Sequence, residues 1–230
     1  MAIFAIGDVH GCNRTLRTLL NHLSPDPGDT IVFVGDYIDR GPDSKGVFDT
    51  IFMMKEAGLD IRCIRGNHEQ MLLDAVRGSH RDRQFFGRNG GDETLNSFHV
   101  DQVDKIAPRY LEFIDQLPYF LEIDRYIFVH GGLDFSIPDP FDRPAEMIWA
   151  RYWYDDIDYN WLGNRIILHG HTPTPFPAAQ KQIQDIHKNK GSVINLDTGC
   201  VYKKRKPGLG VLTAVNLETL ELTMVKNIDM

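Results

Sequence analysis

The sequence has little of what marks secreted or membrane-spanning proteins. Cys12, Cys63 and Cys200 are too few, odd in number and too scattered for a disulfide framework, which favours a reducing compartment. No apolar run approaches the roughly 20 residues that a membrane helix needs. Residues 1–6 are a short strand-like run that reaches Gly7 at once, so we expect no signal peptide. Together these absences predict a cytoplasmic protein.

The sequence also lacks an excess of positive charge. Its 25 Lys and Arg residues against 32 Asp and Glu residues give a net charge of -7 at pH 7. This argues against bulk attraction to nucleic acid or to anionic membranes, so a local cluster of cations must capture any anionic substrate. The 230 residues are 42% hydrophobic. Because no internal repeat or linker interrupts them, we expect one α/β domain over residues 1–230.

Short apolar segments that are typical of strands buried on both faces recur along the chain. Each runs into a polar, glycine-containing stretch, and the segments are residues 2–6, 31–34, 61–64, 126–129, 165–168 and 193–196. Between the first three segments, apolar residues recur at the spacing of a helix. Asn13 is placed to cap the first of these helices and Asp43 or Ser44 to cap the second. This alternation predicts a parallel sheet with right-handed crossovers. Residues 210–225 are expected to form a terminal hairpin.

Six polar side chains stand just after these predicted strands. The carboxyl ends of strands are where open α/β sheets bind ligands, so the sheet could bring the six together. They are two carboxylates, an amide and three imidazoles: Asp8, His10, Asp36, Asn67, His130 and His171. This mixed set suits borderline divalent ions such as Mn, Fe, Zn or Co. Six ligands fit two metals that share a carboxylate, and two such metals promote in-line displacement at phosphorus.

Five sequence blocks, GDVHG, GDYIDRG, GNHE, HGG and GHTP, occur in this order between Gly7 and Gly199. They resemble the calcineurin-like metallophosphoesterases, in particular the phosphoprotein phosphatase branch with its small bacterial and phage serine/threonine phosphatases. The resemblance implies an α/β fold in which a two-sheet β-sandwich is flanked by helices. It also implies two divalent ions as cofactors, and we expect manganese, with Fe, Zn, Co or Ni as the alternatives.

Carried over block by block, the resemblance implies a role for each of ten residues. Asp8 and His10 would hold one metal, Asp36 would bridge, and Asn67, His130 and His171 would hold the second. His68 would be the general acid, oriented by Asp39, and the arginines that clamp the phosphate would be Arg40 and Arg151. A fork-shaped guanidinium suits two phosphate oxygens. A neighbouring carboxylate is expected to keep the imidazole of His68 in its charged form.

These features predict phosphoester hydrolysis by direct attack of a metal-bridging hydroxide, without a phosphoenzyme. Glu69 and the Asn89-Gly90-Gly91 run favour a serine/threonine protein phosphatase acting on a phosphoprotein. The LDTGC string at 196–200 equally resembles the symmetrical dinucleoside tetraphosphatases, which makes a dinucleoside polyphosphate the alternative substrate. A catalytically inactive scaffold that binds phosphorylated partners is disfavoured, because the full set of ligands and His68 is present.

Three stretches remain open to interpretation. Residues from about 71 to 117 turn polar and helical, and we interpret them as a helical excursion over one edge of the sheet. The aromatic and acidic residues 151–161 either fill the core beneath a solvated loop or wall a substrate groove. The basic run 203–206 is either a solvated turn or a flank of the site that attracts an anionic substrate.

Overall fold

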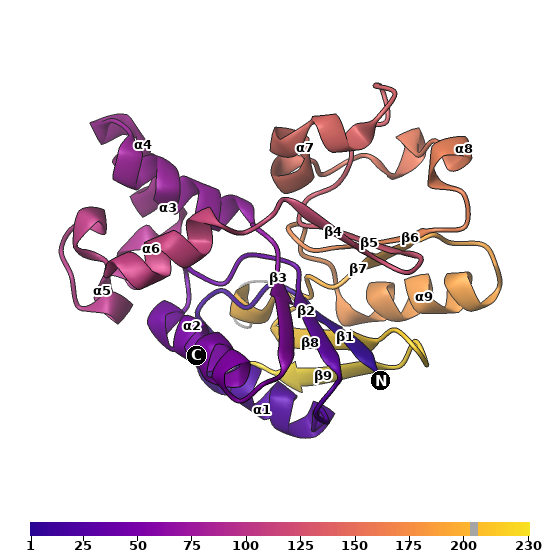
Figure 1. The fold of residues 1–230 in the computed structure, drawn as a ribbon, viewed down its shortest axis with the longest axis horizontal. Coiled ribbons are helices and arrows are strands. Elements are labelled where there is room, and N and C mark those ends of the chain that lie inside the picture. Colours follow the sequence, from indigo (N-terminus) through magenta and orange to yellow (C-terminus); the bar gives the residue numbers. More distant parts are fainter. Residues whose placement is uncertain (203–206) are drawn as a thin grey trace.

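Two β-sheets form the centre of the computed structural model, which describes residues 1–202 and 207–230 (Figure 1). One sheet has the strand order β3-β2-β1-β8-β9 and the other the order β4-β5-β6-β7. The strands are β1 (Ile3–Ile6), β2 (Thr30–Phe33), β3 (Asp60–Cys63), β4 (Phe120–Ile123), β5 (Tyr126–Val129), β6 (Ile166–His169), β7 (Val193–Asn195), β8 (Val211–Asn216) and β9 (Leu222–Lys226). Strands β1, β2 and β3 are parallel, as are β5, β6 and β7, and β8 joins β1 antiparallel.

The two sheets pack face to face because their strands are apolar on both sides. In β2, Ile31 and Phe33 point toward the helices, whereas Val32 points toward the other sheet. In β5, Phe128 faces the core between the sheets and Ile127 faces outward. Successive side chains of a strand alternate between its faces, so a continuous apolar run is what a strand between two layers requires.

Helices cover both outer faces of this sandwich (Figure 1). Helices α1 and α2 pack on the five-stranded sheet, α7 and α8 lie over the four-stranded sheet, and α9 contributes to the core between the sheets. Helices α3 to α6 gather beside the sandwich. Their bounds are α1 (Asn13–Leu23), α2 (Ser44–Glu56), α3 (Asn67–Arg77), α4 (His80–Phe86), α5 (Asp92–Phe98), α6 (Pro108–Asp115), α7 (Pro144–Trp149), α8 (Tyr159–Leu162) and α9 (Phe176–His187). The predicted two-sheet sandwich flanked by helices is confirmed. None of the helices in the described ranges is long and apolar enough to span a membrane.

Two local expectations need correction. Strand β4 was not predicted, because its half-buried sequence Phe-Leu-Glu-Ile carries neither a fully apolar nor an alternating pattern. Asn13 does not cap α1 but is its first residue. Its buried side chain instead donates to Asp43 and accepts from Thr50, both at 2.8 Å. Asp43, by contrast, caps α2 as expected, accepting from the Gly46 amide.

Asp229 satisfies the amino-terminal end of α1 in place of Asn13. Its carboxylate accepts the backbone amides of Arg14 and Thr15, both at 2.9 Å, and the Thr15 hydroxyl. The first amides of a helix have no partner within the helix, and the helix dipole favours an anion beside them. The cap of α1 is therefore supplied by a residue more than 200 positions away.

We expect Asp229→Ala to lower the free energy of unfolding by about 1–2 kcal/mol, because it removes a capping anion and leaves two amides without a partner. Urea denaturation followed by circular dichroism measures the change. Asp104→Ala is the matched control, since Asp104 is exposed and caps no helix, and it should change stability by less than about 0.5 kcal/mol. Equal losses in the two variants would contradict the capping role.

Candidate metal centre

The ends of five strands converge at the junction of the two sheets. Strand β1 leads to Asp8 and His10, β2 to Asp36, and β3 to the start of α3, while the other sheet contributes the segments after β5 and β6. Parallel strands end at the same edge of a sheet, which is why the polar stretches meet. All seven residues brought together in this way are buried: Asp8, His10, Asp36, Asn67, His68, His130 and His171.

The backbone at this junction is in an unusual conformation. His10, Asp36, Asp39, Arg40 and His171 all have positive φ angles, between 44° and 72°. Residues with a Cβ atom rarely adopt this left-handed region, and they cluster at binding and catalytic sites when they do. The turns after the strands are thus strained in the way that functional loops commonly are.

The candidate ligand atoms form two groups that share one carboxylate. Within each group all atoms lie within 4.8 Å of one another: His10, Asp36 and His68 form the first, and Asp36, His130 and His171 the second. The Oδ2 atom of Asp36 lies 3.4 Å from His10 Nε2 and 3.9 Å from His68 Nε2. Its Oδ1 atom lies 3.2 Å from His130 Nε2. Asp36 therefore presents one oxygen to each group.

Backbone carbonyls fix the orientation of two of the imidazoles. His10 donates from Nδ1 to the carbonyl of Ile38, and His130 donates from Nδ1 to that of Val34, each at 2.8 Å. A carbonyl only accepts, so Nδ1 carries the proton and Nε2 turns a lone pair inward, as in metal-binding histidines. His130 Nε2 then lies 2.9 Å from Asn67 Oδ1, an oxygen that only accepts. A proton on Nε2 satisfies this contact without a metal, and a bound metal ion would take the place of that proton.

The charges around His130 also favour a cation. Burial alone would lower the pKa of His130, but the carboxylates of Asp36 and Asp8 outweigh it and raise the pKa to about 9. Burial raises the pKa of Asp8 well above its ordinary value, and the nearby Asp197 adds to the rise. A bound divalent ion would offset this repulsion among buried carboxylates.

Two buried atoms at the centre have no hydrogen-bond partner among the described residues. They are Asp8 Oδ1 and His171 Nε2. Glycines leave room for the carboxylates, since a Cβ atom on Gly170 would lie 1.9 Å from Asp8 Oδ1 and one on Gly66 would lie 2.2 Å from Asp36 Oδ1. Because unpaired buried polar atoms are costly, this oxygen and nitrogen donor set fits two divalent ions.

The grouping differs in one respect from the pairing that the resemblance implies. His68, not Asp8, completes the close group around His10. Asp8 lies beside the second group instead, where its Oδ2 atom accepts from the backbone amide of His171 at 2.9 Å. The assignment of Asp8 and His10 to one metal therefore stays a prediction.

His68 and Asp39 form a buried pair, with His68 Nδ1 2.6 Å from Asp39 Oδ2. The hydroxyl of Thr94 supports the pair by donating to Asp39 Oδ1 at 2.6 Å. Burial lowers the pKa of His68 to about 3, with Asp36 opposing and Arg40 reinforcing the shift. Burial likewise raises the pKa of Asp39. Burial thus opposes the charged form of His68 that a neighbouring carboxylate predicts.

The carboxylate of Glu69 organises two of the turns. It accepts the backbone amides of Asp36 and Tyr37, both at 2.9 Å, of Gly66 at 3.0 Å, and of Ile38 at 3.4 Å. Burial raises the pKa of Glu69 to about 8 and Asp36 adds to the rise, whereas the Tyr37 amide opposes it. Glu69 thereby ties the turn after β2 to the start of α3.

Two arginines border a cleft of about 200 Å³ above the ligand groups. Arg40 Nη1 lies 2.6 Å from His10 Nε2, and its guanidinium carbon lies 5.6 Å from the ring centre of Tyr202. Arg151 donates from Nη1 to the carbonyl of His171 at 3.0 Å. Neither arginine forms an ion pair with a carboxylate in the described ranges. The cleft is lined by Asp36, Arg40, Asn67, His68, Arg151, His171, Pro173 and Tyr202.

Within residues 151–161, one aromatic residue fills the core and another lies at a surface pocket. Trp153 is buried in the core and donates from Nε1 to the Gly131 carbonyl at 3.0 Å. Tyr152 is 94% exposed and lines a surface pocket together with Arg151.

His169 belongs to neither ligand group, and its Nε2 lies 2.6 Å from the Tyr154 hydroxyl. The basic run 203–206 lies outside the described residues.

Three buried residues of the site were not singled out from the sequence as functional. Glu69 stands inside the GNHE block, and Asp197 stands inside the LDTGC string. Asp197 accepts from the Gly199 amide at 2.9 Å, and burial raises its pKa to about 6. Thr94 carried no signal beyond its place shortly after the Gly90-Gly91 pair. Contacts with distant segments identify Glu69 and Thr94, and burial beside the ligand groups identifies Asp197.

Comparison with known proteins agrees with this geometry. Residues 1–199 match the model of the family described as calcineurin-like phosphoesterase. A symmetrical bis(5'-nucleosyl)-tetraphosphatase of Dechloromonas aromatica is 33% identical, with 99% of this chain and 86% of the relative covered. Serine/threonine-protein phosphatase 1 of Salmonella typhimurium is 37% identical, but the match covers 53% of this chain and 52% of the relative.

A solved structure has the same fold. It is a protein serine/threonine phosphatase from Saccharomyces cerevisiae, which superposes with a TM-score of 0.69 at 18% identity and covers 100% of this chain and 81% of its own. At this identity the likeness concerns the fold alone. The family match extends over every strand that contributes to the metal centre. The chain is a calcineurin-like metallophosphoesterase.

Proposed function

We propose that the protein hydrolyses a phosphate ester or anhydride with the help of two divalent metal ions. The observation that carries this proposal is the position of Asp36, whose two oxygens face two separate ligand groups in one cleft. Arg40 and Arg151 border the same cleft without carboxylate partners. Paired metal sites beside unpaired guanidinium groups are what a phosphoryl group with its charged oxygens requires.

Each residue of the centre has a proposed role in binding metal or phosphate. Asp8, His10, Asp36, Asn67, His130 and His171 would hold the two ions, for which manganese is the first candidate. When bound, the ions would lower the pKa of an attacking water and offset the charge on the phosphate. Arg40 and Arg151 would grip two oxygens of the scissile phosphate and align it for attack.

His68 lines the cleft and would give a proton from Nε2 to the departing oxygen, for which the ring must first carry a proton on both nitrogens. Asp39 lies 2.6 Å from His68 Nδ1 and would stabilise the positive charge that the ring carries before this transfer and loses as the Nε2 proton leaves. Thr94 holds Asp39 in position for this task. The buried hydrogen-bonded pair thus orients the imidazole, which is the part of its role that does not depend on the metals.

For the substrate we propose a dinucleoside polyphosphate. The match to the Dechloromonas aromatica tetraphosphatase extends over nearly the whole chain, and this supports the nucleotide class. A phosphoprotein is the second candidate, supported by the higher identity to the Salmonella typhimurium phosphatase over about half of the chain. Localisation in the cytoplasm, organisation as one domain and preference for manganese remain predictions from the sequence.

We expect Asp36→Asn to reduce bound metal to less than one ion per chain and to lower kcat by about 100-fold or more, because the shared ligand loses its charge. Metal content after dialysis, measured by mass spectrometry, and phosphate release give the two readouts. The surface variant Asp155→Asn is the control and should keep both ions. Retention of two ions by the Asp36 variant would contradict the bridging role.

We expect His68→Asn to lower kcat by about 10²–10⁴-fold while both ions stay bound, as loss of a general acid should. Asp39→Asn should cause a smaller loss, about 10–100-fold, because it disturbs only the orientation of the imidazole. Exposed His22 provides the control variant His22→Asn. If His68→Asn instead loses one ion, His68 is a ligand and not the proton donor.

The substrate proposal is tested by loading the protein with manganese and comparing diadenosine tetraphosphate with a phosphothreonine peptide at equal concentration. We expect faster turnover of the dinucleotide, with chromatography of the products giving the position of cleavage. Faster turnover of the peptide would reverse the order of the two candidates. Two bound metals without activity on either would revive the scaffold interpretation.

A further inference from the structure

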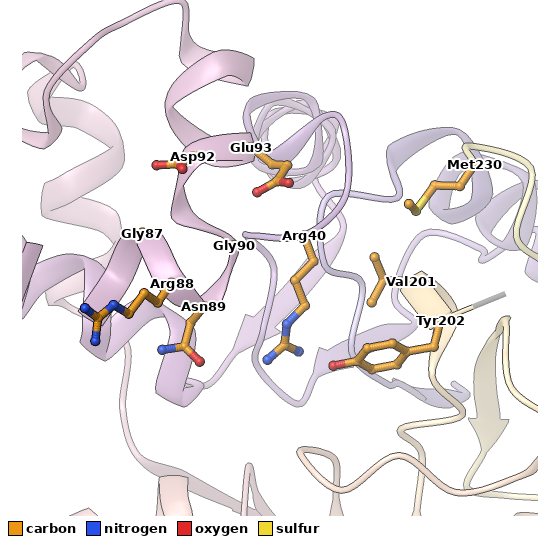
Figure 2. A pocket seen from close by; sticks show the side chains of 10 residues that line it. All are labelled: Arg40, Gly87, Arg88, Asn89, Gly90, Asp92, Glu93, Val201, Tyr202 and Met230. Carbon is orange, nitrogen blue, oxygen red and sulfur yellow. The ribbon is translucent and has the colours of Figure 1, made fainter. Parts of the chain in front are cut away.

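A second pocket, of about 310 Å³, adjoins the cleft on its Arg40 side (Figure 2). Arg40 and Tyr202 line both the pocket and the cleft, so a substrate held by Arg40 can extend directly from one into the other. Most of the remaining lining comes from residues 87–93, a segment that runs from the end of α4 into the first turn of α5 and has taken no part in the proposed chemistry.

This segment is fixed tightly against Arg40. The backbone amide of Arg40 donates to the Gly90 carbonyl at 3.1 Å. Gly90 has a φ angle of 104°, and a Cβ atom there would lie 2.7 Å from both the backbone nitrogen and the Cγ atom of Arg40. The segment therefore presents its side chains at a defined position relative to the arginine that borders the cleft.

Arg88 has no structural role in this segment. Its side chain is exposed and lines the pocket, yet it forms no hydrogen bond or ion pair with any residue of the described ranges. In Figure 2 the amide of Asn89 lies between the guanidinium groups of Arg88 and Arg40, and the ring of Tyr202 flanks Arg40 on the other side. Two arginines without carboxylate partners in the described ranges, lining one pocket of a protein with net charge -7, point to an anion.

The same pocket also contains two carboxylates. Asp92 and Glu93 line it, and in Figure 2 they stand apart from the Arg88 and Asn89 side chains. They would repel an anion placed beside them but can accept hydrogen bonds from sugar hydroxyls. The pocket is thus cationic at one end and rich in acceptors at the other, and a nucleoside phosphate has the complementary pattern.

We propose that Arg88 binds a second phosphate group, one that lies farther along the substrate than the phosphate attacked at the metal centre. This inference rests on the proposed function and narrows it to substrates with a chain of phosphates ending in a nucleoside. A phosphopeptide with a single phosphate would leave Arg88 without a partner. Arg88 is in this view a residue for substrate specificity, and the chemistry at the metal centre does not require it.

The test compares two substrates in the manganese-loaded enzyme: diadenosine tetraphosphate and p-nitrophenyl phosphate, which has only one phosphate. We expect Arg88→Gln to lower the ratio of their kcat/KM values about tenfold, the effect of losing one charged hydrogen-bonding group. Arg88→Lys should recover part of the ratio. Arg81→Gln, which removes an exposed arginine of the preceding helix, is the control and should leave the ratio as it is. An equal loss on both substrates, or no loss, would overturn the proposal.

A binding measurement separates this inference from the proposed function. Isothermal titration of the full chain with inorganic tripolyphosphate and with orthophosphate needs no turnover. We expect Arg88→Gln to weaken tripolyphosphate about tenfold relative to orthophosphate. A wild-type protein that hydrolyses nothing but shows this difference would refute the proposed function and keep the subsite. An active enzyme in which Arg88→Gln leaves the relative affinity unchanged would refute the subsite alone.

Discussion

The structure of the site depends on one buried carboxyl group that lines neither the cleft nor the pocket beside it. Glu69 accepts backbone amides from the turn after β2 and from the residue just before α3, and so holds together two segments that are far apart in sequence. Asp36 stands on the first segment and His68 on the second. A carboxylate that accepts several amides makes their geometry rigid, because every alternative arrangement leaves buried polar atoms unpaired. Rigid positioning is what a pair of metal sites requires.

This rigidity is built from parts that disfavour folding when taken alone. Residues with a Cβ atom at positive φ angles and buried carboxylates close to one another both raise the energy of the chain without metal. The two flanking cores, one between the sheets and one beneath α1 and α2, supply the compensating apolar burial. Such a conflict between local stability and site geometry is expected where cations are to be bound.

The sequence predicted the strands and the residues that follow them, because both depend on local pattern. A strand buried on two faces needs a continuous apolar run, and the polar residues after it must lie at the edge of the sheet. It did not predict Thr94 beside Asp39, Asp229 at the start of α1 or the pocket beside Arg40. Each of these depends on a contact across tens or hundreds of residues, for which no spacing rule exists. Strand β4 was missed because a half-buried edge strand has no distinctive alternation.

The pairing of β1 with β8 has a consequence for synthesis on the ribosome. Strand β1 lies between β2 and a strand that is completed only at residue 216. During synthesis one edge of β1 therefore has no partner until β8 has been made, and the turn bearing Asp8 and His10 stays unsupported on that side. Until then the unpaired backbone groups along this edge can bind strands of other chains. Chaperones that shield strand edges should therefore assist the folding of this protein.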